Sequence, residues 1–277
     1  MRALKTVFDF YINSSIHVAL AVVALSWVTC LEFGVFFDIN MACFIGLASI
    51  TGYNFVKYFG LAKFHHRSLS NALKTIQIFS MFCFIVMCYF LQNLNRASLI
   101  AIGIFGMITF LYAIPLLPNR FFVDTKQKLR SVSGLKIYII ALVWSGVTIL
   151  LPVINSAYDL HGDVILSSVQ RFIFVIVLML PFEIRDLNYD SLKLATIPQR
   201  IGVKRTKTIG LILSSVLIVL EFFKDDINQS HLLTLILIVL VIVLFLMNAE
   251  KHQGKYYSSF WVESLPMWWL VLLLMLS

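Results

Sequence analysis

The hydrophobic positions of this chain form long uninterrupted runs, with polar and charged residues collected between them. A run of roughly twenty apolar residues is long enough for an α-helix to cross a hydrocarbon core of about 30 Å. The pattern predicts an all-α membrane protein with nine spans: Tyr11–Phe33, Ile39–Leu61, Thr75–Leu91, Ala97–Leu117, Leu135–Ile154, Val164–Ile184, Thr208–Phe223, His231–Asn248 and Tyr257–Leu276.

Composition agrees with this class. Hydrophobic residues make up 60% of the chain and charged residues 13%, which excludes an ordinary soluble domain. Residues 1–5 lack the short apolar region and small-residue cleavage site of a signal peptide, so we expect the first run to be retained as a span. The four cysteines lie in or beside apolar runs and are read as buried thiols. We therefore expect one integral membrane domain over residues 1–277.

Lys and Arg residues are concentrated in every second loop. All but three of the 22 Lys and Arg residues fall at the amino terminus, in alternate loops or at the adjoining helix ends; the exceptions are Arg96, Arg171 and Lys224. The positive-inside rule then predicts a cytoplasmic amino terminus and an outside carboxy terminus. Sidedness accounts for the net charge of +8 without a nucleic-acid partner, although part of it can serve anionic lipid headgroups. We expect a bacterial inner (cytoplasmic) membrane, with the long basic loops forming a cytoplasmic working face.

The sixth span ends in a group of carboxylates. Read as a helix, Glu183, Asp186 and Asp190 lie three and four residues apart and share one face. Like charges at this spacing repel, and ionised groups at membrane depth are costly and usually functional. A divalent cation bound by carboxylate oxygens would offset the repulsion. The alternative is neutralisation by nearby basic side chains, namely Arg185, Lys193 and Arg200.

A second polar face lies on the second span. Asn54, Lys57 and Tyr58 are spaced three and four apart, so they face the same side of a helix. This face is predicted either to hold an anion in a polar cavity or to place Lys57 at the membrane interface. Tyr112, near the end of the fourth span, is equally suited to bind a phosphate or to join the aromatic belt of the interface.

Two stretches resemble a known family. Arg185–Asp190 (RDLNYD), followed by Thr196–Gly202 (TIPQRIG), is similar to the second aspartate-rich motif of the UbiA superfamily of intramembrane prenyltransferases. Leu111–Pro115 (LYAIP) is similar to the family's short tyrosine- and proline-containing motif at the end of the fourth span. The resemblance implies a UbiA-like helical bundle over the whole chain, with its motif loops on the cytoplasmic side.

The resemblance also implies an activity, namely transfer of a prenyl group from a polyprenyl diphosphate to an aromatic or other lipophilic acceptor. Family members hold magnesium ions on the diphosphate through two aspartate-rich motifs. Carried over by position, Asp186 and Asp190 are the expected catalytic metal ligands, with Glu183 beside them. The expected diphosphate-binding residues are Asn54, Lys57, Tyr112, Arg185 and Arg200.

The first aspartate-rich motif is degenerate. Its asparagine is kept as Asn54, but its three acids are replaced by Phe55, Tyr58 and Ala62, which cannot hold magnesium. Either Lys57 replaces one metal as a fixed cation, leaving a one-metal enzyme, or catalysis is lost. The second possibility describes a non-catalytic relative that binds an isoprenoid or a membrane partner. An unrelated transporter fits less well, because transporters tend to place their sites near the bilayer midplane.

Overall fold

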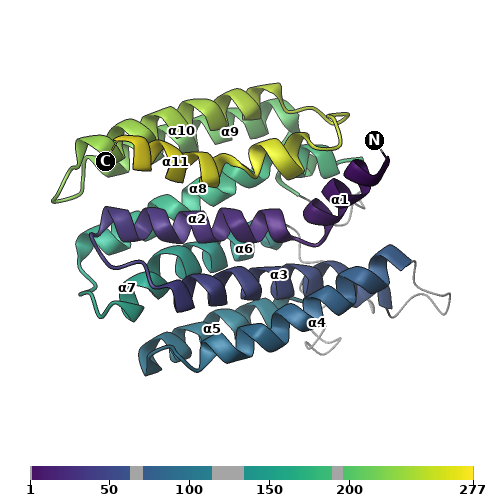
Figure 1. The fold of residues 1–277 in the computed structure, drawn as a ribbon. Helices are drawn as coiled ribbons and strands as arrows, with labels where there is room; N and C mark the ends of the chain where they lie inside the picture. Colours follow the sequence, from purple (N-terminus) through teal and green to yellow (C-terminus); the bar gives the residue numbers. More distant parts are fainter. Residues whose placement is uncertain (1, 63–70, 114–133, 189–195, 277) are drawn as a thin grey trace, which may run out of the picture.

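The computed structural model describes residues 2–62, 71–113, 134–188 and 196–276, and all regular elements among them are helical. The helices lie side by side as one elongated bundle (Figure 1). In chain order they are α1 (Arg2–Asn13), α2 (Ile16–Glu32), α3 (Ile39–Ala62), α4 (Asn71–Leu91), α5 (Arg96–Ala113), α6 (Leu135–Ser145), the π-helical η3 (Gly146–Leu150), α7 (Leu151–Asn155), α8 (Gly162–Asp186), α9 (Ile197–Glu221), α10 (Gln229–Asn248), the π-helical η5 (Tyr257–Val262) and α11 (Leu265–Leu276).

Burial distinguishes central from peripheral helices. In the most apolar part of α8, 61% of the residues are buried, against 11% for α4. Most exposed positions of α4 are apolar nevertheless, including Ile78, Met81 and Phe82. An apolar surface of this kind is expected to face lipid, because water would disfavour it. The protein is therefore an integral multi-pass membrane protein whose core surrounds α8 and α2 (Figure 1).

The predicted count of nine spans is confirmed only in part. Among the described residues, seven helices are long and apolar enough to cross a membrane, or up to eight if the bent pair α1 and α2 forms one span. The predicted span Thr208–Phe223 lies in α9, which is not one of them. The apolar part of α9 follows Lys207, and the turns before it carry several basic residues. The seventh of the predicted spans, Thr208–Phe223, therefore stays a prediction, and so does the count of nine.

The first predicted span is divided by an elbow. Its residues from Tyr11 to Asn13 belong to α1, whose axis makes an angle of 56° with that of α2. The chain turns at Ser15, which has a left-handed φ of 64° that few non-glycine residues adopt. The first predicted span is therefore a bent pair of helices and not one straight helix, and its start near Tyr11 stays a prediction.

A glycine conformation marks the second half of the family-like motif. α9 begins after Thr196, whose backbone N–H donates to Gln199 Oε1 at 3.0 Å. Five residues later Gly202 breaks the helix with φ 81° and ψ 160°. A side chain would be strained at this φ, which explains why the position is glycine. The motif thus forms a short helical segment that is set off from the rest of α9.

The two ends of the bundle differ in the elements they contain. We call the end that holds the carboxyl ends of α3 and α8 the motif end, and the opposite end the far end. The elbow and η5 lie at the motif end, and the turn between α9 and α10 lies at the far end (Figure 1). The carboxyl end of α11 also lies at the far end. The motif end is the face predicted to be cytoplasmic.

Candidate functional site

At the motif end, the polar face of α3 meets the elbow. Asn54 is 3% exposed, and its amide nitrogen donates to the Ser14 carbonyl (2.9 Å) and to Ser80 Oγ (2.7 Å). Its amide oxygen accepts a hydrogen bond from Ser15 Oγ at 2.8 Å. Both N–H donors are therefore used within the protein, and none is left in this arrangement for a phosphate oxygen. Asn54 stabilises the joint between α1 and α2.

Lys57 and Tyr58 reach the same elbow. Lys57 Nζ donates to Ser15 Oγ at 2.8 Å, and the Tyr58 hydroxyl donates to the Asn13 carbonyl at 3.0 Å. The three side chains thus lie on one face of α3, as their spacing predicts. An ammonium group has three donors, so a single bond to Ser15 leaves Lys57 able to bind an anion as well. Lys57 is the member of this face best suited to ligand binding.

At the end of α8, Asp186 lies between two cations. Its Oδ1 accepts hydrogen bonds from the Arg185 guanidinium at 2.8 Å, and its Oδ2 lies 3.5 Å from Lys136 Nζ on α6. The three side chains are 17 to 35% exposed, so the cluster faces a polar surrounding. In this arrangement the Asp186 carboxylate is engaged by side chains of the protein. This is the neutralisation by basic neighbours that the sequence left as an alternative to a metal.

The remaining predicted residues are spread over the same end. Glu183 lies on α8, one turn before Asp186, and is 2% exposed. Tyr112 is 4% exposed near the end of α5, and Arg200 is exposed on the first turns of α9. All three take part in further interactions. Asp190 lies outside the described residues, so its predicted role as a metal ligand stays a prediction.

The sequence analysis did not identify Glu263, which follows η5 at the start of the last apolar segment. The charges of Lys57 and Arg185 both act on its carboxyl group, although they lie on α3 and α8. The side chain is half-buried within the predicted ninth span. The Glu263 carboxyl group forms no hydrogen bond and no ion pair within 4.0 Å with any described residue. A single carboxylate in a strongly apolar run was a signal that could have identified it.

One aromatic hydroxyl group interacts with this carboxyl group. Tyr53 on α3 interacts electrostatically with Glu263 and with Tyr112 of α5. Its hydroxyl also accepts a hydrogen bond of 2.7 Å from the Trp144 indole of α6. The surroundings of Glu263 thus include the aromatic side chain of Tyr53 and two cationic groups, with a second carboxylate, Asp186, beside Arg185. We call Lys57, Arg185, Asp186 and Glu263 the motif-end site.

The structure brings some of the predicted residues together and not others. The charges of Lys57 and Arg185 both act on the Glu263 carboxyl group, and Tyr53 interacts electrostatically with both Glu263 and Tyr112. Asn54 instead donates a hydrogen bond to the Ser14 carbonyl at the elbow, while Asp186 is paired with Arg185 and Lys136. No group of three or more His, Cys, Asp or Glu residues among those described is arranged to hold a metal ion. The described residues therefore do not fit a magnesium site by themselves.

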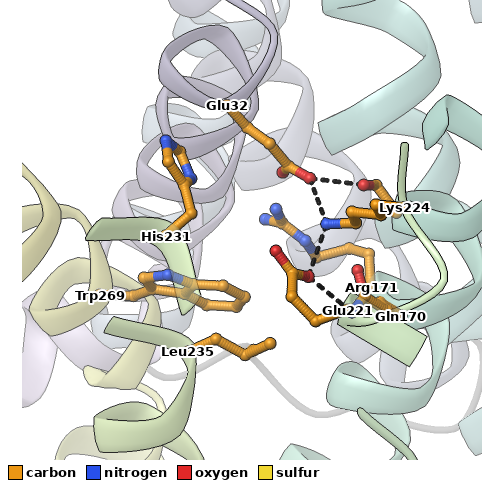
Figure 2. A pocket seen from close by; sticks show the side chains of 9 residues that line it. Glu32, Gln170, Arg171, Glu221, Lys224, His231, Leu235 and Trp269 are labelled. Atoms are coloured by element: carbon orange, nitrogen blue, oxygen red, sulfur yellow. Dashed lines mark hydrogen bonds and ion pairs between the residues drawn. The ribbon is translucent and has the colours of Figure 1, made fainter. Parts of the chain in front are cut away.

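A second charged cluster lies at the far end and was not predicted. Lys224 Nζ lies 2.7 Å from Glu32 Oε1 and 2.7 Å from Glu221 Oε2, which also accepts from Gln170 at 2.9 Å (Figure 2). Arg171 is 2% exposed and donates to the Leu25 carbonyl at 3.0 Å. We call Glu32, Arg171, Glu221 and Lys224, together with Gln170, the far-end network.

The far-end network lines a cavity of ≈ 20 Å³, which has room for about one water molecule. The Trp269 side chain lies over the Arg171 guanidinium at 5.0 Å and closes one side (Figure 2). Burial lowers the pKa of Lys224, but the carboxylates of Glu32 and Glu221 outweigh it, so its pKa is raised overall. The network therefore holds a charged lysine within a small closed space, with no room for a substrate.

Comparison with known proteins identifies the fold. No protein-family model matches the chain, and no curated protein matches it. One solved structure is similar, and it is described as giving structural and mechanistic insight into digeranylgeranylglyceryl phosphate synthase in membranes. The likeness covers 100% of this chain and 97% of that chain, with 14% sequence identity and a TM-score of 0.57. The chain thus shares the helical fold of that structure.

Proposed function

We propose that this protein transfers a prenyl group from a polyprenyl diphosphate to an aromatic or other lipophilic acceptor within the membrane. One observation carries the proposal. In a fold that resembles a digeranylgeranylglyceryl phosphate synthase, Lys57 of α3 and Arg185 of α8 lie at the motif end, and the charges of both act on the Glu263 carboxyl group. Both helices carry the stretches that resemble the aspartate-rich motifs of prenyltransferases. Lysine and arginine side chains bind phosphate oxygens through charge-assisted hydrogen bonds, and a diphosphate is an anion that suits them.

The chemistry requires stabilisation of the departing diphosphate. When the bond between the allylic carbon and the diphosphate oxygen breaks, negative charge grows on that oxygen. Cationic donors fixed in a water-poor site stabilise this charge. Lys57 and Arg185 would bind the diphosphate, and Lys136 adds a third cation beside Asp186. The aromatic walls formed by Tyr53 and Trp144 would keep water from the allylic cation.

Magnesium is part of the proposal, and one metal site is better supported than two. Asp186 and Asp190 are the proposed ligands, with Glu183 beside them, and Arg200 is proposed to contact the phosphates. In the described arrangement Asp186 contacts Arg185 and Lys136, so metal binding requires these contacts to open. When bound, the metal would neutralise the diphosphate charge as a Lewis acid. The assay below separates transfer that depends on magnesium from transfer supported by the cationic side chains.

A non-catalytic relative that binds an isoprenoid diphosphate is the second candidate. It is favoured by the pairing of Asp186 with two cations and by Phe55 and Tyr58 in place of motif acids. Such a protein would hold the diphosphate with Lys57 and Arg185 and would not break its bond to carbon. Binding without turnover therefore distinguishes the two candidates.

The deciding experiment measures binding and turnover separately. Purified protein in lipid nanodiscs is given labelled geranyl, farnesyl or geranylgeranyl diphosphate, with magnesium or with a chelator. The acceptors are 4-hydroxybenzoate and a glyceryl phosphate lipid that carries one geranylgeranyl group. We expect diphosphate binding and label transfer to an acceptor. Loss of one charge-assisted contact in Lys57→Met is expected to weaken binding about 10- to 100-fold.

The matched control is Lys204→Met, which removes an exposed lysine of α9. It is expected to bind diphosphate as the parent does. Binding without release of diphosphate for any acceptor would support the non-catalytic candidate. Absence of binding at every chain length would overturn both, because the two cations would then have another role.

A further inference from the structure

Two amide side chains join the carboxyl end of α8 to the segment between α10 and η5. Gln253 Nε2, from that segment, donates to the Pro181 carbonyl of α8 at 3.1 Å. In the opposite direction Asn188 Nδ2, just beyond α8, donates to the Lys251 carbonyl at 2.9 Å. The bonded residues are 72 and 63 positions apart in the chain, so both bonds are tertiary contacts. We call these two hydrogen bonds the amide bridge.

The amide bridge holds α8 on both sides of its charged residues. Pro181 comes before Glu183, and Asn188 comes after Asp186, the last residue of the helix. The part of α8 that carries the predicted ligands therefore lies between two points that are attached to another segment. Because the backbone is held at both points, the Arg185 and Asp186 side chains extend from a defined position.

The proline explains why α8 needs a partner here. Pro181 is buried inside the helix and has no N–H, so the hydrogen bond to the Val177 carbonyl one turn earlier is missing. A carbonyl oxygen has two lone pairs, so the Pro181 carbonyl can accept from Gln253 beside its helical bond. The external donor thus contacts α8 at the turn where the helix lacks a bond of its own.

The segment that supplies Gln253 is itself attached to the bundle. Gln253 Nε2 also donates to the hydroxyl group of Ser258, a fully buried residue of η5. The hydroxyl group of the neighbouring Tyr257 donates to the Phe245 carbonyl of α10 at 2.6 Å. Gln253 therefore links α8 to a part of the chain that is held by α10. The Asn188 bond is exposed, so water competes for it and we expect it to add little to stability.

We infer that Gln253 and Asn188 are positioning residues for the diphosphate site, and that they act through Arg185 and Asp186. This inference rests on the proposed prenyl transfer, in which Arg185 binds the diphosphate and Asp186 is a metal ligand. Negative charge on the departing oxygen is stabilised best by groups that are held in place before the bond breaks. Neither amide side chain touches the substrate. Loss of the amide bridge should therefore slow the reaction more than it weakens binding.

The test compares Gln253→Glu and Asn188→Asp with the parent in the nanodisc assay. Each variant keeps the shape of the side chain but replaces the donating NH₂ group with an oxygen, which repels the carbonyl it faces. We expect turnover at saturating diphosphate to fall about 10- to 100-fold, because a misplacement of about 1 Å can cost 10²-fold in rate. The Kd for diphosphate should change less than about threefold, because Lys57 and Arg185 remain.

Two further variants separate positioning from general damage. Asn188→Gln keeps an amide donor and should stay within about threefold of the parent. Asn248→Asp is the matched control, because Asn248 is exposed and its amide donates at 2.8 Å to the Leu244 carbonyl of its own helix. It should turn over like the parent. A purely structural role would instead reduce the number of diphosphate-binding sites and the turnover in proportion, and that result would overturn the inference.

Hydrogen exchange tests the amide bridge without any substrate. The backbone amides of residues 183–188 should exchange about tenfold faster in Gln253→Glu and in Asn188→Asp than in the parent, the factor that corresponds to loss of about one hydrogen bond. Asn188→Asp changes an exposed position, so it keeps the test decisive if Gln253→Glu folds poorly. Unchanged exchange in Asn188→Asp, or faster exchange with unchanged turnover, would overturn the inference. Failure of the parent to bind diphosphate would instead overturn the proposed function, and the positioning role with it, whatever the exchange shows.

Discussion

The motif-end site and the far-end network both place acids and bases inside a membrane protein, but they satisfy them differently. In the far-end network, Glu32 and Glu221 each contact Lys224, and Glu221 also contacts Gln170. In the motif-end site, the carboxyl group of Glu263 has no hydrogen bond or ion pair with a described residue. The Lys57 ammonium group has N–H donors beyond the one that bonds to Ser15. The contrast indicates that charge at membrane depth does not by itself identify a working site. A charged side chain with unused hydrogen-bonding capacity, close to an opposite charge, is the more specific sign of a ligand-binding site.

The far-end network has the properties of scaffold. It joins α2, α8 and α9 through residues far apart in sequence, and its two acids are balanced by Lys224 and Arg171. Its cavity of ≈ 20 Å³ is too small for a prenyl chain. The energetics follow from this closure, because a buried ion pair contributes little net stability while removal of one partner is strongly destabilising.

The largest effect is therefore expected at Lys224. Its side chain is only 6% exposed, and Lys224→Met would leave Glu32 and Glu221 without their common cation. We expect a loss of about 3–5 kcal/mol in the free energy of unfolding, measured by denaturation in detergent micelles. Protein that remains folded should bind diphosphate like the parent. Lys204→Met, on the same helix but exposed, should unfold like the parent.

The same lysine gives this prediction a pH readout. The pKa of Lys224 is raised in the folded state, because the carboxylates outweigh burial. A raised lysine pKa adds stability that is fully present below the unfolded value of about 10.4 and is lost as pH rises through the folded value. The stability difference between parent and Lys224→Met should therefore narrow above that pH. A constant difference would mean that packing of the side chain, and not its charge, stabilises the far end.

The sequence predicted the features that depend on near neighbours along one helix. The apolar runs identified most of the membrane-spanning helices, and the spacing of Asn54, Lys57 and Tyr58 identified their shared face. Contacts between helices were not accessible in the same way. Lys224 and Glu32 are 192 positions apart, and no periodic pattern records that pairing. The sequence also did not predict that the α3 face contacts the elbow at Ser15. A glycine there would have indicated a left-handed turn, but serine does not.

The site was predicted less completely than the fold for the same reason. Lys57 and Arg185 were identified from motif positions, and the structure places both near one carboxylate. That carboxylate, Glu263, comes from the last apolar segment, which the sequence analysis treated as a span with aromatic anchors. The position of Glu263, just before α11, depends on the packing of α11 against α2 and of α2 against α3. Helix packing of this kind is set by side chains on several helices at once.

An intermediate effect is expected at the elbow. Asn54→Ala removes two buried hydrogen bonds and one partly buried one, and it leaves the Ser14 carbonyl without its Asn54 donor. Loss of one partner of buried polar groups typically costs about 1–3 kcal/mol, so unfolding should occur at correspondingly lower denaturant concentration. Lys57→Met is the contrasting variant. It removes one bond to Ser15, which still donates to Asn54, and should change stability less than Asn54→Ala does. Equal losses in the two variants would contradict the assignment of Asn54 to scaffold and Lys57 to ligand binding.

The smallest effect is expected where charges meet at the surface of the motif end. Lys255, before η5, bonds to Asp9 of α1, and this hydrogen bond raises the pKa of Lys255. The Lys255 side chain is 60% exposed, so salt and water screen the pair. Lys255→Met should leave the unfolding midpoint unchanged at moderate ionic strength, measured beside Lys251→Met as an exposed control. A clear loss of stability would show that α1 depends on this pair for its position. In that case α1 would belong to the scaffold of the motif end, because its angle to α2 would depend on the Lys255–Asp9 pair as well as on the hydrogen bonds of Asn54.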